Sequence, residues 1–322
     1  MIRIIHKILY FLDEDSRTTL SKIAKRLKTS EQRISYTVKS MIKKRQIKGF
    51  ATVFDYAKFD YNAYIVAFRT NYQLKEETNK LLNDIKEHPE TILMEKLQGR
   101  LDLITMFLSP NPSSFNKTLK KLISDNKKVI RENHICTVIV MHKFNKQYLH
   151  PWIKIKDDKV IGGDRDPLKL SETQKKICKA LLDKPTGKLN ELGKTTKLTF
   201  KTLTKKIKEL RKKRVIRTFE PIINHEKIGI DRKKILLKYE SYDQRIENNL
   251  TSFCKLNPNI VSITKTFGSW DSIIDFESIK EERINEFINK LRETFEGIIA
   301  SIEIIDVERT DKRIYLPSNH FS

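Results

Sequence analysis

The chain has 322 residues and carries 64 lysines and arginines against 41 aspartates and glutamates, which gives a formal charge of +23. This balance argues against an ordinary metabolic enzyme and makes a polyanion the first partner to consider, nucleic acid ahead of a membrane surface. At roughly 100–200 residues per domain, the length predicts two or three domains. No segment reaches the ~18 uncharged apolar residues of a membrane-spanning helix, so we expect a soluble, intracellular protein.

An internal repeat divides the chain into two copies that are 169 residues apart. Such a repeat determines how many domains the chain contains. Aligned pairs include Ile47 with Ile216, Phe50 with Phe219, Gly99 with Gly268, Asp102 with Asp271 and Ile135 with Ile304. The copies are joined by residues 144–169, whose prolines, paired glycines and charged residues are typical of a linker. Within it, Trp152–Ile155 is a candidate extra strand.

Each copy begins with three short helical patterns and a run of β-forming residues. In the first copy apolar residues recur at helical spacing around Ile8, Ile23 and Ile34, and Ser30 is a candidate N-cap of the third helix. The residues 47–54 that follow are β-branched and aromatic, which predicts a hairpin. Three helices and a hairpin predict winged helix-turn-helix domains at residues 1–60 and 170–229.

The rest of each copy alternates between strand and helix patterns. In the first copy we expect strands at about 63–69, 91–97, 101–108 and 132–141, with helices at about 74–85 and from Pro112 onward. The order βαββαβ is that of a ferredoxin-like domain, at residues 61–143 and again at 230–322. The fold class is therefore α+β, a tandem repeat of helix-turn-helix and ferredoxin-like domains. An antiparallel sheet with both helices on one face leaves the other face open, and the second copy can cover it.

The third helix of each copy is where a helix-turn-helix domain would read DNA. Between residues 22 and 48 ten basic residues face one acidic residue, and between 199 and 217 nine face one. Gln32 and Arg33 suit adenine and guanine respectively, whereas lysines suit phosphates. The predicted DNA-contacting residues are Ser30, Gln32, Arg33, Tyr36, Lys39, Ser40 and Lys43 in the first copy and Thr199, Lys201, Thr202, Lys205, Lys208 and Lys212 in the second. We expect the first copy to be the more selective reader and the second the stronger clamp. The poor helix formers Gly193, Thr195 and Thr196 in the second helix of copy two leave open a degenerate domain that serves for pairing or phosphate binding.

The stretch Leu20–Leu27, with Ser30, Val38, Met41 and the run Ile47–Phe50, resembles the DNA-binding domain of the Lrp/AsnC (feast/famine) family of archaeal and bacterial transcription regulators. The family's sensing domain is a RAM-type ferredoxin-like domain. The part of it that leads into the central hairpin resembles Asn257–Ile260 and Gly268–Asp271 of this chain. The resemblance implies double-stranded DNA as partner and pairing of sensing domains, which two fused copies would achieve as a pseudo-dimer within one chain. It also implies a cytoplasmic, nucleoid-associated location and allows a higher oligomer.

The same resemblance implies a small-molecule effector, often an amino acid, near the turns that contain Gly99, Asp102, Gly268 and Asp271. Family members carry a small hydroxyl residue before this glycine and an acidic residue after it. Here Gln98 and Phe267 precede the glycines, and Arg100 and Ser269 follow them. An α-amino group would lose its carboxylate partner, so the identity of any effector stays open. A tight turn between strands would need these glycines without a ligand.

Catalytic and metal sites have little support in the sequence. The three cysteines are far apart, with no paired spacing, and His134, Cys136 and His142 are too spread along one strand to bind one metal, since residues 134 and 142 would be about 27 Å apart at ~3.4 Å per residue. We therefore expect no cofactor, no metal and no enzyme activity. Two alternatives to a sequence-specific regulator remain. One is an architectural chromatin protein. The other is an enzyme like the siroheme decarboxylases, which share Lrp-like folds and use a His–Arg pair near the place of Asn224–Lys227, where this chain has His225 without the Arg.

Overall fold

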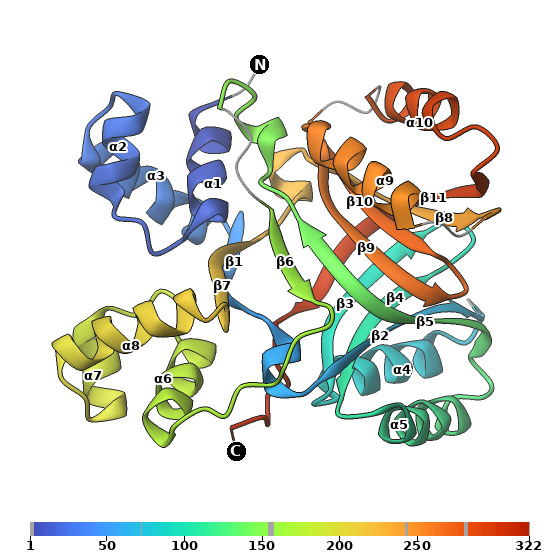
Figure 1. Cartoon of the computed structure of the whole chain (residues 1–322), viewed down its shortest axis with the longest axis horizontal. Helices are drawn as coiled ribbons and strands as arrows, with labels where there is room; N and C mark the ends of the chain where they lie inside the picture. Colours follow the sequence, from blue (N-terminus) through green and yellow to red (C-terminus); the bar gives the residue numbers. More distant parts are fainter. Residues whose placement is uncertain (1–2, 72, 154–157, 242–243, 280–282, 322) are drawn as a thin grey trace.

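The structure is a computed structural model that describes residues 3–321 except 72, 154–157, 242–243 and 280–282. Two helical domains lie on one side of the molecule and a large sheet flanked by helices lies on the other (Figure 1). The α+β tandem fold predicted from the sequence is confirmed. Of the candidate strand Trp152–Ile155, the last two residues lie outside the described part of the chain, and the first two form a turn and a bend.

Each helical domain consists of three helices around a small apolar core. Ile8, Ile23, Ile34 and Met41 are fully buried in the first domain because they recur on the inward faces of its helices. The third helix begins where Ser30 accepts a hydrogen bond from the backbone of Arg33, as predicted from the capping pattern. The helices are α1 (Ile4–Glu14), α2 (Leu20–Leu27) and α3 (Glu31–Lys43), then α6 (Glu172–Asp183), α7 (Leu189–Thr196) and α8 (Phe200–Lys212).

The residues expected to form a hairpin in each copy form one strand instead. These strands, β1 (Ile47–Phe54) and β7 (Ile216–Ile223), pair with each other in antiparallel orientation as a separate two-stranded sheet. The hairpin prediction is therefore wrong. A run of β-branched and aromatic residues specifies a strand but not its partner, and the partner here comes from the other copy.

Both ferredoxin-like domains have the predicted order of elements. The helices pack on the outer face of the sheet (Figure 1). In the first copy, Leu81 of α4 and Phe115 of α5 share an apolar cluster with Val66 and Phe68 of β2. The first copy contains β2 (Asn62–Thr70), α4 (Lys75–Glu87), β3 (Thr91–Gln98), β4 (Leu103–Ser109), α5 (Pro112–Asp125) and β5 (Ile130–Lys143); the second contains β8 (Asp231–Tyr239), α9 (Gln244–Leu256), β9 (Ile260–Gly268), β10 (Ser272–Ser278), α10 (Arg283–Thr294) and β11 (Ile299–Arg313).

Two long strands join the domains into one closed sheet. Residues 130–137 of β5 pair with β2 of the same copy, and residues 136–143 pair with β9 of the other. In the same way, residues 299–306 of β11 pair with β8, and residues 306–313 pair with β3. The strand order β2-β4-β3-β11-β8-β10-β9-β5 returns to β2, so the sheet has an enclosed inner face.

The segment between the copies is packed against the fold. It contains the short helix η2 (Gln147–Leu149) and the strand β6 (Lys159–Gly162), which pairs with the end of β5. Beyond β6, Arg165 contacts the buried carboxylate of Asp55, which also accepts a hydrogen bond from the Gly162 backbone at 2.8 Å. The short helices η1 (Tyr56–Phe59) and η3 (Glu226–Ile228) lead from β1 and β7 into the closed sheet.

Candidate nucleic-acid interface

The third helix of the first copy presents a polar face to solvent. Ile34, Val38 and Met41 are buried and fix its orientation, while Tyr36 is 76% exposed. A cavity of about 430 Å³ lies beside the exposed residues and is lined by Gln32, Tyr36 and Lys39 among others. Of the predicted DNA contacts on this helix, Gln32, Arg33, Tyr36, Lys39 and Lys43 are exposed, Ser40 is half-buried, and Ser30 is the exposed N-cap.

The third helix of the second copy presents a row of lysines in the same way. Leu203, Ile207 and Leu210 are buried against the other helices. Thr199 caps the helix by accepting a hydrogen bond from the Thr202 backbone. Of the predicted contacts, Lys201, Lys205, Lys208, Lys212 and Thr199 are exposed, and Thr202 is half-buried. Phe200, which is not among the predicted contacts, is 61% exposed at the first position of the helix. Its position could have been noticed in the sequence, because an apolar residue directly follows the N-cap Thr199.

The predicted basic contacts on these two helix faces form no hydrogen bond or ion pair with other side chains that the structure describes. Among the described residues, Arg33, Lys39 and Lys43 of α3 make no side-chain hydrogen bond or ion pair, and the same holds for Lys201, Lys205, Lys208 and Lys212 of α8. On α8 the acidic Glu209 pairs instead with Lys206, at 2.8 Å. Both helices therefore keep their positive charge available for an anionic partner.

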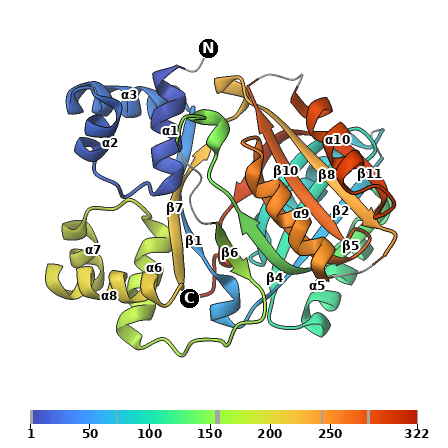
Figure 2. The same ribbon diagram turned by 45° about the horizontal axis from the view of Figure 1, so that its top comes forward.

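Direct contacts fix the two helical domains relative to each other. Arg211 of α8 pairs with Asp15 at 2.6 Å, and the Arg17 guanidinium donates to the Pro185 carbonyl at 2.8 Å. The Thr218 hydroxyl of β7 donates to the Glu14 carbonyl, which ties the end of α1 to the strand of the other copy. The domains lie side by side, on the same side of the closed sheet, with β1 and β7 beside them (Figure 2).

The aspartates of the predicted effector turns hold the ends of neighbouring strands. Asp102 accepts hydrogen bonds from the Thr70 backbone at 2.6 Å and from the Thr70 hydroxyl at 3.0 Å. Asp271 accepts from the Tyr239 backbone at 2.8 Å and pairs with Lys238 at 3.1 Å. These carboxylates therefore have a structural role that needs no ligand.

The glycines of the two turns differ in their surroundings. Gly268 has φ +136°, and a Cβ atom added there would lie 2.3 Å from the Ile135 carbonyl oxygen of β5. Gly99 has a similar φ of +131°, yet an added Cβ would meet nothing within 4 Å. The turn at Gly99 is open to a small molecule, whereas the turn at Gly268 is closed by β5.

His225, the residue considered for a catalytic role, belongs to a buried group of charged side chains. Its Nε2 lies 3.2 Å from Glu277, which also bonds to Tyr148 at 2.6 Å. Burial lowers the pKa of His225 to about 4, so the ring is neutral at pH 7. The positive charges of Lys146 and Arg232 hold the pKa of Glu277 well below its usual range despite its burial. The cavity lined by His225 has a volume of only about 20 Å³, far too small for a tetrapyrrole.

The cysteine and histidines considered as metal ligands are kept apart by other contacts. Cys136 is fully buried, and its Sγ accepts a hydrogen bond from the Trp270 backbone at 3.4 Å. His142 bonds to Asp158 at 2.7 Å. Within the described part of the chain, no group of three or more His, Cys, Asp or Glu side chains is arranged to hold a metal ion.

The first helical domain matches a known DNA-binding family, and known regulators match this chain over most of their own length. Residues 3–48 match a family model described as winged helix-turn-helix DNA-binding. The HTH-type transcriptional regulator FL11 of Pyrococcus horikoshii is 30% identical over 137 residues, which are 42% of this chain and 84% of FL11. FL11 of Pyrococcus furiosus is 27% identical over 151 residues, 46% of this chain and 96% of that protein.

Solved structures of a siroheme decarboxylase resemble the chain over nearly its whole length. The siroheme decarboxylase NirDL, in complex with an iron-uroporphyrin III analogue, aligns with a TM-score of 0.60 and covers 98% of this chain and 94% of its own. The two sequences are 12% identical, so the likeness concerns the fold alone. Across the described residues, no helix has the length and apolar character that crossing a membrane requires.

Proposed function

The chain belongs to the Lrp/AsnC family of transcription regulators and is a DNA-binding regulator of this type, and we propose that it binds specific double-stranded sites as a pseudo-dimer within one polypeptide. The observation that carries the proposal is the pair of third helices, α3 and α8. Both expose basic side chains that make no ion pair within the described chain, and both domains are held in place by the β1–β7 pairing.

The pseudo-dimer is supported by three sets of contacts between the copies. The strands β1 and β7 pair, β5 and β11 each extend from one copy into the other, and Arg211 bonds to Asp15. Two helix-turn-helix domains fixed in this way would engage two stretches of one duplex together, as dimeric regulators do. The protein would then act on the nucleoid. Further self-association through the sensing domains is an extension of the same proposal.

The first domain would supply most of the sequence discrimination. Gln32 and Arg33 can make bidentate contacts to base edges, each worth about 1–3 kcal/mol of discrimination. The second domain would supply affinity, because its exposed face consists mainly of lysines that suit phosphates. Phe200 and Tyr36 add exposed rings at the same faces.

Fluorescence anisotropy with a labelled fragment of the protein's own promoter tests the proposal over a series of salt concentrations. The double substitution Arg33→Ala and Lys39→Ala should weaken binding and reduce the preference over unrelated DNA, because it removes base and phosphate contacts. Lys117→Ala with Lys120→Ala is the matched control, since both lysines are exposed on α5, outside the helix-turn-helix domains. Absence of binding at about 50 mM salt would contradict DNA binding by this chain.

The second domain has its own signature in the same assay. Lys201→Ala with Lys205→Ala should weaken binding to all DNA sequences alike and reduce the slope of log K against log salt by about 2, since each phosphate contact contributes roughly 0.9. An unchanged slope would mean that α8 does not contact DNA.

The two alternative functions make different predictions. An architectural chromatin protein would show even genome-wide occupancy and little preference among DNA fragments, whereas an operator-specific regulator would show discrete peaks. A decarboxylase of the NirDL kind has only the shared fold in its favour, because His225 is enclosed and pairs with Glu277. Binding of a family-type effector at the sensing-domain turns remains a prediction, with the open turn at Gly99 as the place to look.

A further inference from the structure

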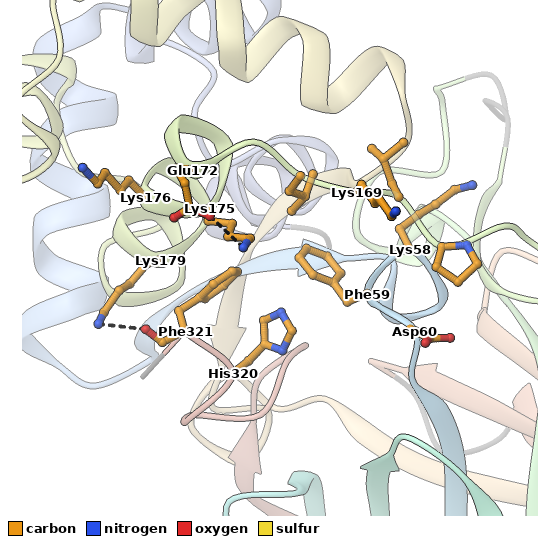
Figure 3. A pocket seen from close by; sticks show the side chains of 13 residues that line it. Lys58, Phe59, Asp60, Lys169, Glu172, Lys175, Lys176, Lys179, His320 and Phe321 are labelled. Carbon is orange, nitrogen blue, oxygen red and sulfur yellow. Dashed lines mark hydrogen bonds and ion pairs between the residues drawn. The ribbon is translucent and has the colours of Figure 1, made fainter.

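A large cleft lies between α6 of the second helix-turn-helix domain, η1 of the first copy and residues 320–321. Its volume is about 1000 Å³, at the upper end of the range for small-molecule sites. The walls come from η1, from the segment 167–170 that leads into α6, from α6 itself, and from the chain near its C-terminal end (Figure 3). The cleft is separate from the exposed face of α8 and from the turns at Gly99 and Gly268.

The corresponding place in the first copy is filled by side chains. There the rings of Tyr10 and Phe11 of α1 pack edge-on against His150, with centroids 5.7 and 5.8 Å apart, and His6 is buried beside them. The repeat offset of 169 aligns His6 with Lys175, Tyr10 with Lys179, and Phe11 with Ala180.

Two rings are thus replaced by exposed lysines and a third by alanine. The two lysines, Lys175 and Lys179, line the cleft and contribute to its positive charge.

The cleft has more lysines than carboxylates, so its lining carries a net positive charge. Five lysines line it against two carboxylates, those of Asp60 and Glu172. Lys175 pairs with Glu172 at 2.8 Å, and Lys179 donates to the Phe321 carbonyl at 3.0 Å. Within the described chain, the side chains of Lys169 and Lys176 make no hydrogen bond or ion pair. The rim can therefore bind an anion with several charges.

Aromatic rings line the cleft between the lysines of α6 and the lysines at positions 58 and 169 (Figure 3). His320 meets Phe59 edge-on at 5.1 Å and Phe321 at 4.5 Å, and its Nδ1 is hydrogen-bonded to the Tyr61 hydroxyl at 2.9 Å (Figure 3). Burial, with a further effect of Lys175, lowers the pKa of His320, which keeps the ring neutral at pH 7. Partly exposed rings of this kind bind the flat face of another ring.

We propose that this cleft is a binding site for a nucleoside polyphosphate, with the base against Phe59, His320 and Phe321 and the phosphates against the lysines of α6 and the preceding segment. The ligand needs both parts, because the cleft combines a neutral aromatic wall with a rim of lysines. It would contact α6 of the second helix-turn-helix domain and η1 of the first copy at once. A bound nucleotide would therefore bridge α6 of the second domain and η1 of the first copy.

Isothermal titration calorimetry of the full chain with ATP, in the absence of divalent metal ions, tests the site directly. We expect saturable binding of one equivalent, at least about fivefold tighter than binding of pyrophosphate, since stacking of a base contributes about 1–3 kcal/mol. Absence of binding at millimolar ATP, or pyrophosphate binding as tight as ATP binding, would overturn the proposal. No DNA is present in this experiment, so its failure leaves the proposal of DNA binding untouched.

Variants separate this site from general attraction between ATP and a basic protein. Lys169→Ala with Lys176→Ala should weaken ATP binding at least about fivefold, because two charge-assisted contacts are lost. The control Lys117→Ala with Lys120→Ala removes the same charge from α5 and should leave the affinity unchanged. Equal losses in both variants would show that ATP binds without a specific site.

A second variant restores the side chains of the first copy. Lys175→His with Lys179→Tyr should fill the cleft and weaken ATP binding at least about tenfold, with circular dichroism and thermal unfolding used to check the fold. The Lys169/Lys176 variant changes only exposed side chains and therefore reports on the site even where the refilled variant is unstable. Undiminished ATP binding by a folded Lys175/Lys179 variant would place the nucleotide elsewhere and contradict the proposal.

Discussion

The two halves of the closed sheet have the same topology but different inner faces. In the first copy Ala63, Ile65 and Leu108 are buried in the main apolar cluster. The offset of 169 aligns them with Arg232, Lys234 and Glu277 of the second copy, which are equally buried. At these three positions the first half of the interior is apolar, whereas the second, the charged half, carries side chains that must satisfy one another's charge.

The charged half is arranged so that each buried ion has partners. Arg232 bonds to Glu95, which also pairs with Lys234 at 2.9 Å. Glu277 forms an ion pair with Lys146 and accepts a hydrogen bond from the Tyr148 hydroxyl. Removing charges from water is expensive, and the mutual attraction repays the cost only when geometry and hydrogen bonds are good. The comparison teaches that one sheet topology accepts either interior, provided that all members of the polar group are present together.

The largest expected effect comes from giving the second copy the residue of the first. Glu277→Leu reproduces Leu108 but leaves Lys146, Arg232 and the Tyr148 hydroxyl without their common acceptor. Breaking a buried ionic group by removing one member costs about 3–5 kcal/mol, and we expect a loss of that size in the free energy of unfolding. Urea unfolding followed by circular dichroism measures it.

The control for this substitution is another glutamate changed to leucine at an exposed position. Glu308 lies on β11, is exposed, and contacts Arg309 at 3.5 Å. Glu308→Leu should change the free energy of unfolding by less than about 0.5 kcal/mol. If Glu277→Leu were as mild as Glu308→Leu, the charged half would be no more demanding than a surface, and the comparison between the halves would fail.

A pH effect of similar size is expected from His225, whose counterpart in the first copy is Tyr56, a residue that stays neutral in the same range. The pKa of His225 is lowered to about 4 by burial, whereas an unfolded histidine titrates near 6.5. Between these values the unfolded chain binds more protons than the folded chain. Stability is therefore complete above about pH 6.5 and falls as the pH is lowered toward 4, by a contribution on the order of 3 kcal/mol.

Unfolding free energies measured from pH 7 to pH 4.5 test this contribution. His225→Gln keeps a neutral polar group beside Glu277 and should flatten the dependence of stability on pH in this window. The low pKa of Glu277 adds a separate loss that sets in below about pH 4.5, where an unfolded glutamate begins to bind protons. A His225→Gln variant with the slope of the parent protein would rule out the histidine as its source.

The sequence predicted the elements and the polar faces of α3 and α8, because periodic apolar residues report which face of a helix is buried. It did not predict the interior of the second copy. Arg232 and Lys234 alternate with other polar residues at the start of β8, a pattern normally typical of a strand that is open to solvent. They are buried because they lie on the inner face of the closed sheet, where both reach Glu95 of the non-adjacent strand β3, a fact of topology that local pattern does not contain.

The predicted hairpin was wrong for a related reason, since the partner of β1 is 169 residues away and the local run of residues is compatible with either pairing. The cleft beside α6 was missed because its signal is a difference between the copies. Lys175 and Lys179 are unremarkable as exposed lysines of a helix. They become informative once they are aligned with the buried His6 and Tyr10.

The smallest expected effect is the difference in stability between two glycine substitutions, one in each of the matching turns. Gly99→Ala and Gly268→Ala both place a side chain at a positive φ, which costs on the order of 1–2 kcal/mol. Only at position 268 does the new Cβ meet backbone, the Ile135 carbonyl at 2.3 Å, so this variant should lose about 1–3 kcal/mol more than its counterpart. Urea unfolding of the two variants measures the difference. Equal losses would mean that β5 yields to the added methyl group and that the two turns are equally open.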